Sequence, residues 1–178
     1  EPVVDGPDDA IRGALTRLFE LGKGFVVTHH ALASWPGWDG WAHAIGGRFL
    51  YAPGLLDGGP TPASGYRMTT HAVEVSEPNH PVCAGIERFE LDDELYLCPV
   101  FEDDIVPLLA TTAAMDGEHF VDTHHEVVHG STDRHCGARR GSEVVAWAKH
   151  VGRSRLVYLQ PGHGPETMGH PMYRRLLA

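Results

Sequence analysis

The chain has 178 residues, a formal net charge of −10, and 14 Lys and Arg against 24 Asp and Glu. This length is typical of a single domain, and the acidic balance excludes a nucleic-acid partner, because phosphate binding needs a basic face. No run reaches the roughly 18 apolar residues of a membrane span and no signal peptide is visible, so we expect no membrane partner and a cytoplasmic location. The three cysteines (Cys83, Cys98 and Cys136) are too few for a disulfide framework and suit a reducing compartment.

The first 50 residues predict a helix, a strand and a second helix. Asp8 caps an amphipathic helix that Gly22 ends. Residues 24–29 form a short, nearly all-apolar run, as in a strand that is covered on both faces within a parallel sheet, so we predict a central buried strand. The second helix is expected between Pro36 and Gly46.

The rest of the chain predicts mainly strands. Residues 53–65 contain four Gly and three Pro and predict a loop, whereas residues 116–142 are polar and predict irregular structure or a short hairpin. Alternation indicates a strand at 70–75, and further strands are expected at 104–110, 143–147 and 156–160. Strands separated by helices predict an α/β fold with an open, mainly parallel sheet and helices on both faces, in one domain over residues 1–178.

Thirteen histidines are the most unusual feature of the composition, and two histidine motifs directly follow apolar strands. His29 and His30 follow the strand that ends at Thr28, and His163 stands between two glycines after the strand at 156–160. Because ligands bind at the carboxyl ends of the strands in open α/β sheets, we expect His29, His30 and His163 to share a cleft. Histidine can transfer protons near neutral pH or bind a metal, so all three are candidate catalytic residues.

Aromatic and acidic side chains complete the candidate site. Trp35 and Trp38 offer flat faces to a sugar ring, although packing in the core of the second helix is an open alternative. Residues 91–96 contain two carboxylates and a tyrosine: Glu94 is the candidate catalytic partner of the histidines, and an exposed acidic turn is the alternative. The candidate substrate-binding residues are Trp35, Trp38, His71, Asp93 and Tyr96.

The segment His125-Glu126-Val127-Val128-His129 has the H-E-x-x-H spacing of a zinc protease, with His135 placed as a third ligand would be. That chemistry needs the first two histidines one turn apart on a helix. The β-prone Val127 and Val128 and the glycine at 130 argue against a long helix, so we predict that residues 125–135 do not form the metal-binding helix of a zinc protease. The chain also lacks phosphate-binding and dinucleotide-binding glycine motifs and the G-x-S-x-G elbow, so no nucleotide cofactor is expected.

In their order along the chain, several weak motifs together resemble the ThuA-like, or trehalose-utilisation, family, which shares the class I glutamine amidotransferase-like (flavodoxin-like) fold. The matching segments are residues 22–31, 45–49, 80–82, 85–86, 93–96, 145–149, 152–158 and 162–163.

The resemblance carries implications for the fold and for the chemistry. Such domains begin with further strands that have no counterpart before Asp8, so we expect an N-terminally incomplete domain. Where a glutamine amidotransferase has its nucleophilic cysteine, this chain has His29 and His30, so glutamine hydrolysis is not expected. The family implies a role in sugar catabolism, around trehalose-like disaccharides and their 3-keto derivatives.

Three functions remain open at this point. The first is an enzyme that acts on a disaccharide or keto-sugar by acid/base chemistry of His29, His30 and His163, with Glu94 as partner. The second is an enzyme that depends on a divalent metal such as zinc, held by the same histidines. The third is a non-catalytic sugar-binding module. In each case the expected partner is a small-molecule sugar, and a homodimer is left open.

Overall fold

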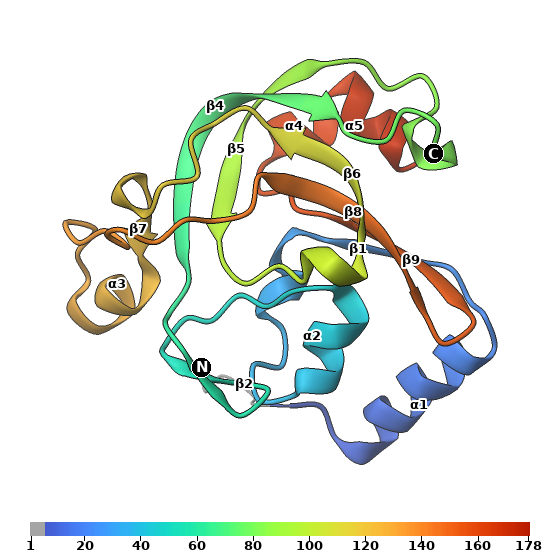
Figure 1. The fold of residues 1–178 in the computed structure, drawn as a ribbon, viewed down its shortest axis with the longest axis horizontal. Coiled ribbons are helices and arrows are strands. Elements are labelled where there is room, and N and C mark those ends of the chain that lie inside the picture. The colour runs from blue at the N-terminus through green and yellow to red at the C-terminus, as the bar shows by residue number, and fades with distance from the viewer. Residues whose placement is uncertain (1–5) are drawn as a thin grey trace.

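The computed structural model describes residues 6–178, which form a curled, mixed β-sheet with helices against it (Figure 1). The strands are β1 (Phe25–Thr28), β2 (Gly54–Leu56), β3 (Gly59–Thr61), β4 (Gly65–Val75), β5 (Phe89–Leu97), β6 (Val106–Thr111), β7 (Val121–Asp122), β8 (Val144–Val151) and β9 (Ser154–Leu159). The helices are α1 (Asp9–Glu20), α2 (Asp39–Ile45), α3 (Thr123–His129), α4 (Pro165–Gly169) and α5 (Pro171–Leu176), with a 3₁₀ turn at His29–Ala33. None of the helices in this part of the chain is long and apolar enough to cross a membrane.

The order of strands in the main sheet is β1-β9-β8-β6-β4-β5, with β7 paired to the start of β4. Among the described strands only β1 and β9 run parallel, and every other pairing is antiparallel. The prediction of an α/β fold is therefore confirmed, whereas the prediction of a mainly parallel sheet is wrong.

A short connection explains the antiparallel pairing of β8 with β9. A parallel neighbour needs a crossover of a dozen or more residues, whereas antiparallel strands can be joined by two. Gly152 and Arg153 make such a two-residue link between β8 and β9, and Gly152 has a positive φ of 57°. Positive φ in a two-residue loop is the usual signature of a β-hairpin. Strands were expected at 143–147 and 156–160, and the structure extends them to Val144–Val151 and Ser154–Leu159, joined by a turn that was not expected.

The strand at Phe25–Thr28 is present, but it is not central. β1 lies at one end of the described sheet, and the side chain of Val26 is 59% exposed. The prediction of a central strand buried on both faces is thus wrong. A short apolar run does not by itself distinguish a strand between two neighbours from one with a single neighbour.

Two other regions have more regular structure than expected. The glycine- and proline-rich segment 53–65 contains the small hairpin of β2 and β3, and the polar segment 116–142 contains β7 and helix α3. The helix begins at Asp122, whose side chain accepts the backbone N–H of His125 at 3.1 Å. It ends at Gly130, which has a φ of 66°. The cap and the glycine stop outweigh the β propensity of the two valines between them.

Apolar side chains pack on both faces of the sheet. One cluster joins Phe19 of α1 and Ile45 of α2 to Trp147 and Tyr158. The other includes Tyr173 of α5 and residues of β4, β5, β6, β8 and β9. Helices therefore cover both faces, as expected. Full burial of a large apolar side chain contributes roughly 1.5–3 kcal/mol, so these clusters hold the strand ends in place.

Candidate functional site

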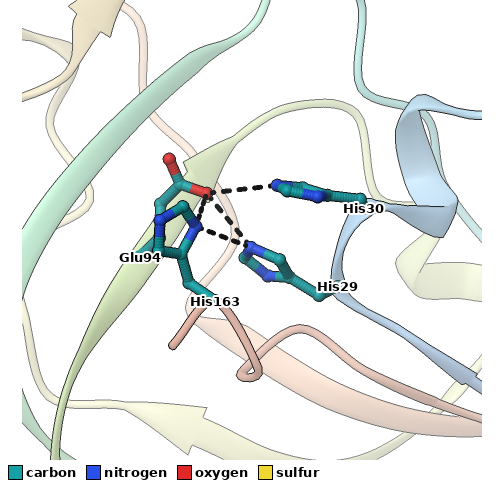
Figure 2. A group of neighbouring side chains, drawn as sticks. All are labelled: His29, His30, Glu94 and His163. Carbon is teal, nitrogen blue, oxygen red and sulfur yellow. Dashed lines mark hydrogen bonds and ion pairs between the residues drawn. The ribbon is translucent and has the colours of Figure 1, made fainter. Parts of the chain in front are cut away.

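Four side chains from three separate segments meet at one edge of the sheet (Figure 2). Nε2 of His29 lies 3.2 Å from Oε2 of Glu94 and 3.1 Å from Nδ1 of His163. The same Glu94 oxygen lies 3.2 Å from Nδ1 of His163 and 4.0 Å from Nε2 of His30. The structure thus places together all four residues that the sequence suggested as catalytic, and their chemical role stays a prediction.

The parallel pairing of β1 with β9 explains this meeting. Thr28 lies opposite Leu159, so the residues that follow each strand emerge at the same edge. His29 adopts a φ of 43°, a left-handed conformation that is uncommon for a residue with a side chain. Its carbonyl oxygen accepts a 2.7 Å hydrogen bond from the Tyr158 hydroxyl. This bond helps to hold His29 in the position that turns its ring toward Glu94.

The hydrogen bonds of His29 fix which ring nitrogen carries a proton. Its Nδ1 lies 2.7 Å from the backbone oxygen of Gln160, and a carbonyl can only accept, so Nδ1 carries the hydrogen. In the neutral ring, Nε2 therefore presents a lone pair to the cluster. The hydroxyl of Tyr96 lies 3.0 Å from this Nε2 and can donate to it.

The backbone of the loop that carries His163 is hydrogen-bonded to the carboxylate of Asp93. One carboxylate oxygen of Asp93 accepts the N–H of Gly162 at 2.7 Å, and the other accepts the N–H of His163 at 3.0 Å. Asp93 is 1% exposed, and it also accepts the N–H of Glu94 at 2.9 Å. We had suggested Asp93 as a substrate contact, but both of its oxygens are engaged by the backbone. In the structure it is a positioning residue.

The cluster changes the acidity of its members. Burial raises the pKa of Glu94, but the hydrogen bond to His29, the charge of His163 and the hydrogen bond to Tyr96 outweigh it and lower the pKa overall. Burial, together with the neighbouring His29 and His163, lowers the pKa of His30 despite the opposing effect of Glu94. Burial and then the Glu94 charge raise the pKa of Tyr96. Near neutral pH the site therefore holds an ionised Glu94, a neutral His30 and a neutral Tyr96.

Three of the suggested substrate-binding residues lie elsewhere. Trp35 and Trp38 pack with Trp41 in an aromatic group, with ring centroids 5.1 Å (Trp35–Trp41) and 6.4 Å (Trp38–Trp41) apart, against the apolar cluster of α1 and α2. His71 is buried on β4, where its Nδ1 lies 2.8 Å from the Thr111 hydroxyl. Both tryptophans therefore pack in the core, which was the alternative to a sugar-binding role. His71 lies on the face of the sheet opposite to Glu94. Tyr96 is the suggested contact that does line the cavity.

The cavity beside the cluster has a volume of about 300 Å³ and includes residues that the sequence analysis missed. Its additional lining residues are Phe49, Tyr51, Tyr66, Met68, Thr123, Glu126 and Val127. Tyr66 lies opposite Tyr96 and Met68 lies opposite Glu94 in the antiparallel β4–β5 pair. Opposed residues share a face of a sheet, so all four point into the cavity. Extending the alternation of 70–75 back to residue 65 would have revealed Tyr66 and Met68.

The H-E-x-x-H segment lies on the short helix α3, which ends at His129. His125 and His129 lie one turn apart on α3, with ring centroids 4.6 Å apart. However, Nε2 of His125 forms a 2.8 Å hydrogen bond with Oδ1 of Asp133. Within residues 6–178, the group of three or more potential ligands that converges is His29, His30, Glu94 and His163, and it does not include α3. The helix is present, but a protease-like zinc centre is not assembled on it.

The donor atoms of the four-residue cluster fit a metal ion. They are three histidine nitrogens and one carboxylate oxygen, all within 4.8 Å of one another. Around zinc, ligands at about 2.0–2.1 Å in tetrahedral directions lie about 3.3 Å apart. The 3.1–3.2 Å separations among His29, Glu94 and His163 match that value, and His30 lies further out.

Comparison with known proteins identifies the family. The ThuA family model, described as trehalose utilisation, matches residues 4–178. The chain belongs to the ThuA family. The resemblance noted in the sequence is confirmed, and membership is consistent with a role in trehalose utilisation.

A solved structure of a ThuA-like protein from Parabacteroides merdae resembles this ThuA chain with a TM-score of 0.63 at 17% sequence identity. The match covers 96% of this chain, which spans 62% of the length of that one. At that identity the likeness shows the fold alone. None of the curated proteins matches the chain.

Proposed function

We propose that this ThuA-family chain is an enzyme of sugar catabolism whose active site is built on one divalent cation, best matched by zinc. His29, Glu94 and His163 would hold the ion, and His30 would orient the ligand beside it. A centre with two histidines and one glutamate that leaves a position open is one of the usual forms of catalytic zinc.

One observation carries this proposal. When His29 is neutral with its hydrogen on Nδ1, its Nε2 lone pair faces Oε2 of ionised Glu94 at 3.2 Å. Two acceptors at that distance repel each other unless a cation or a proton lies between them. Nδ1 of His163 lies 3.1 Å from the same Nε2, so in the His163 tautomer that leaves Nδ1 without a hydrogen, a metal ion would satisfy three acceptors at once.

The hydrogen bond from His29 Nδ1 to the Gln160 carbonyl supports the same conclusion. Metal-binding histidines almost always donate their other ring N–H to an oxygen, which fixes the tautomer and the orientation of the ring. A divalent ion in this position would polarise a carbonyl or hydroxyl oxygen of a sugar. Tyr51 and Tyr66 in the same cavity offer aromatic faces to the C–H side of the ring.

A second candidate function places a proton where the cation would lie. His29 would then be an imidazolium paired with Glu94, and the site would work by histidine acid/base chemistry alone. The exposed side chain of His30 favours this alternative, because its lowered pKa leaves it free to accept a proton at neutral pH.

Turnover before and after chelation separates the candidates. The protein is assayed against trehalose and its 3-keto derivative as purified, after treatment with EDTA, and after reloading with Zn²⁺. The metal-dependent proposal predicts activity that is lost on chelation and restored by the ion. Activity that survives complete metal removal would favour the proton-based alternative, and sugar binding without any product would indicate a binding module.

A further inference from the structure

The cavity beside the cluster has a second wall, formed by helix α3. Glu94, Tyr96 and His163 line one side, and Thr123, Glu126 and Val127 line the other. In Figure 1, α3 lies beside β7, at the start of β4. The cavity therefore lies between the histidine cluster and a helix that contributes a second carboxylate.

The helical period explains why Glu126 points into this cavity. Residues three and four apart share a face of a helix, as Thr123, Glu126 and Val127 do. The intervening His124 and His125 line a different cavity, on the other side of α3. The histidines of the H-E-x-x-H segment thus point away from the candidate site, and its glutamate points toward it.

Backbone pairing and a hydrogen bond connect the start of helix α3 to the start of β4. Val121 pairs with Tyr66 and Asp122 pairs with Gly65, so α3 starts directly beside the cavity. The N–H of Thr123 also donates to the Ser64 carbonyl at 3.2 Å. These anchors give a seven-residue helix a fixed position, although its propensity alone would not stabilise it.

Glu94 and Glu126 have different surroundings. Oε2 of Glu94 is within 3.2 Å of two histidines, so this carboxylate is committed to the cluster. Glu126 is half-buried, forms no ion pair within residues 6–178, and lines the same cavity as Tyr66. Burial and the Glu126 and Glu94 carboxylates raise the pKa of Tyr66 to about 12, so the tyrosine stays a neutral hydrogen-bond donor.

We propose that Glu126 is a catalytic carboxylate that removes a proton from the carbon next to the carbonyl group of a keto-sugar. This inference rests on the proposed function, because the histidine cluster must bind the carbonyl oxygen on the opposite wall. The base can then reach the C–H group while the cluster stabilises the negative charge that develops on the carbonyl oxygen.

The step balances without a further reactant. Glu126 takes the proton, the C–H electron pair becomes the C=C bond of an enolate, and the carbonyl π pair moves to its oxygen. The protonated Glu126 then returns a proton to carbon and the electron pairs move back. In D₂O the carboxyl proton of Glu126 exchanges with solvent before it is returned, so the cycle replaces hydrogen on that carbon with deuterium.

The test is deuterium exchange into the 3-keto derivative of trehalose, followed by NMR with zinc-loaded protein in D₂O. Glu126→Gln keeps the size of the side chain but cannot take up the proton. We expect it to slow exchange by about 10²–10⁴-fold, the usual contribution of a positioned acid/base group. Its zinc content should equal that of the wild type, because Glu126 is not in the cluster.

His129→Gln is the matched control, because it changes a residue on the other side of the same helix. It should exchange at the wild-type rate. Glu126→Gln that exchanges as fast as the wild type would overturn the role of Glu126, and so would a zinc-loaded wild type that exchanges nothing. Wild-type protein that takes up no zinc would instead contradict the proposed metal centre. Metal analysis measures this outcome independently of deuterium exchange.

Discussion

The buried carboxylate of Asp93 receives the backbone N–H groups of both Gly162 and His163, at 2.7 and 3.0 Å. Asp93 and Glu94 are adjacent in β5 and point to opposite faces of the sheet. One supports the loop that presents His163, and the other contacts the His163 ring at 3.2 Å. Two consecutive acidic residues therefore set both the position and the electrostatic environment of one histidine.

Asp93→Asn tests this support. The amide group replaces one acceptor oxygen with a donor, which leaves a buried backbone N–H unpaired. Because hydrogen bonds to a charged group contribute about 1.5–3 kcal/mol, we expect the free energy of unfolding to fall by about that amount. Displacement of His163 should weaken zinc binding by about 10–100-fold, as loss of a supporting hydrogen bond usually does.

Denaturant unfolding and zinc titration measure the two effects. Asp92→Asn is the matched control, since Asp92 is the exposed neighbour on the same strand. An Asp93→Asn variant with wild-type stability and zinc affinity would show that the loop does not depend on this carboxylate.

A bound cation should stabilise the folded chain. A ligand that binds only the native state adds about 2.7 kcal/mol at a free concentration one hundred times its Kd. We therefore expect Zn²⁺ to raise the Tm of the wild type by several degrees in calorimetry. His163→Ala should abolish the rise, whereas His150→Ala, at an exposed position away from the cluster, should retain it. An equal rise in all three proteins would assign the effect to other histidines.

The burial of His71 leads to a prediction of how the free energy of unfolding changes with pH. Burial lowers the pKa of His71 below its ordinary value of 6.5, so the folded chain keeps it neutral while the unfolded chain protonates it. The unfolded state then binds more protons, and stability falls as the pH drops below about 6.5. His71→Asn, which can replace Nδ1 as the partner of Thr111, should flatten this fall in denaturant unfolding between pH 7 and 5. His150→Asn should not change the slope.

The sequence predicted which residues meet at the site, but it did not predict the strand pairing of the sheet that positions them. His29 and His163 each follow a strand, and β1 and β9 are the strands that pair in parallel, so the argument from strand ends applies to them. The remaining pairings are antiparallel, and hydrophobic periodicity reports neither the two-residue turn at Gly152 that joins β8 to β9 nor the pairing of strands that lie far apart in the sequence. Glu94 was proposed as a catalytic partner because it lies in an acidic segment. The pairing of β4 with β5 explains why this segment is a strand and not an exposed turn.

Residues of the second wall were missed for a different reason. Glu126 was considered only as part of a zinc-protease motif, and Val127 and Val128 were used only to argue against a long helix. Both arguments treated the segment in isolation. The role of Glu126 depends on the pairing of β7 with β4, a contact between residues more than 50 positions apart that no local pattern encodes.

The most direct test of the central claim is the zinc content and zinc X-ray absorption spectrum of the purified protein after reloading. We predict one zinc per chain, with nitrogen and oxygen ligands at about 2.0–2.1 Å and at least two histidines. Glu94→Ala should lose the bound zinc, and Glu90→Ala, at an exposed position on the same strand, should retain it. A wild-type chain that takes up no zinc, or one whose zinc is unchanged in Glu94→Ala, would contradict a metal centre at His29, Glu94 and His163.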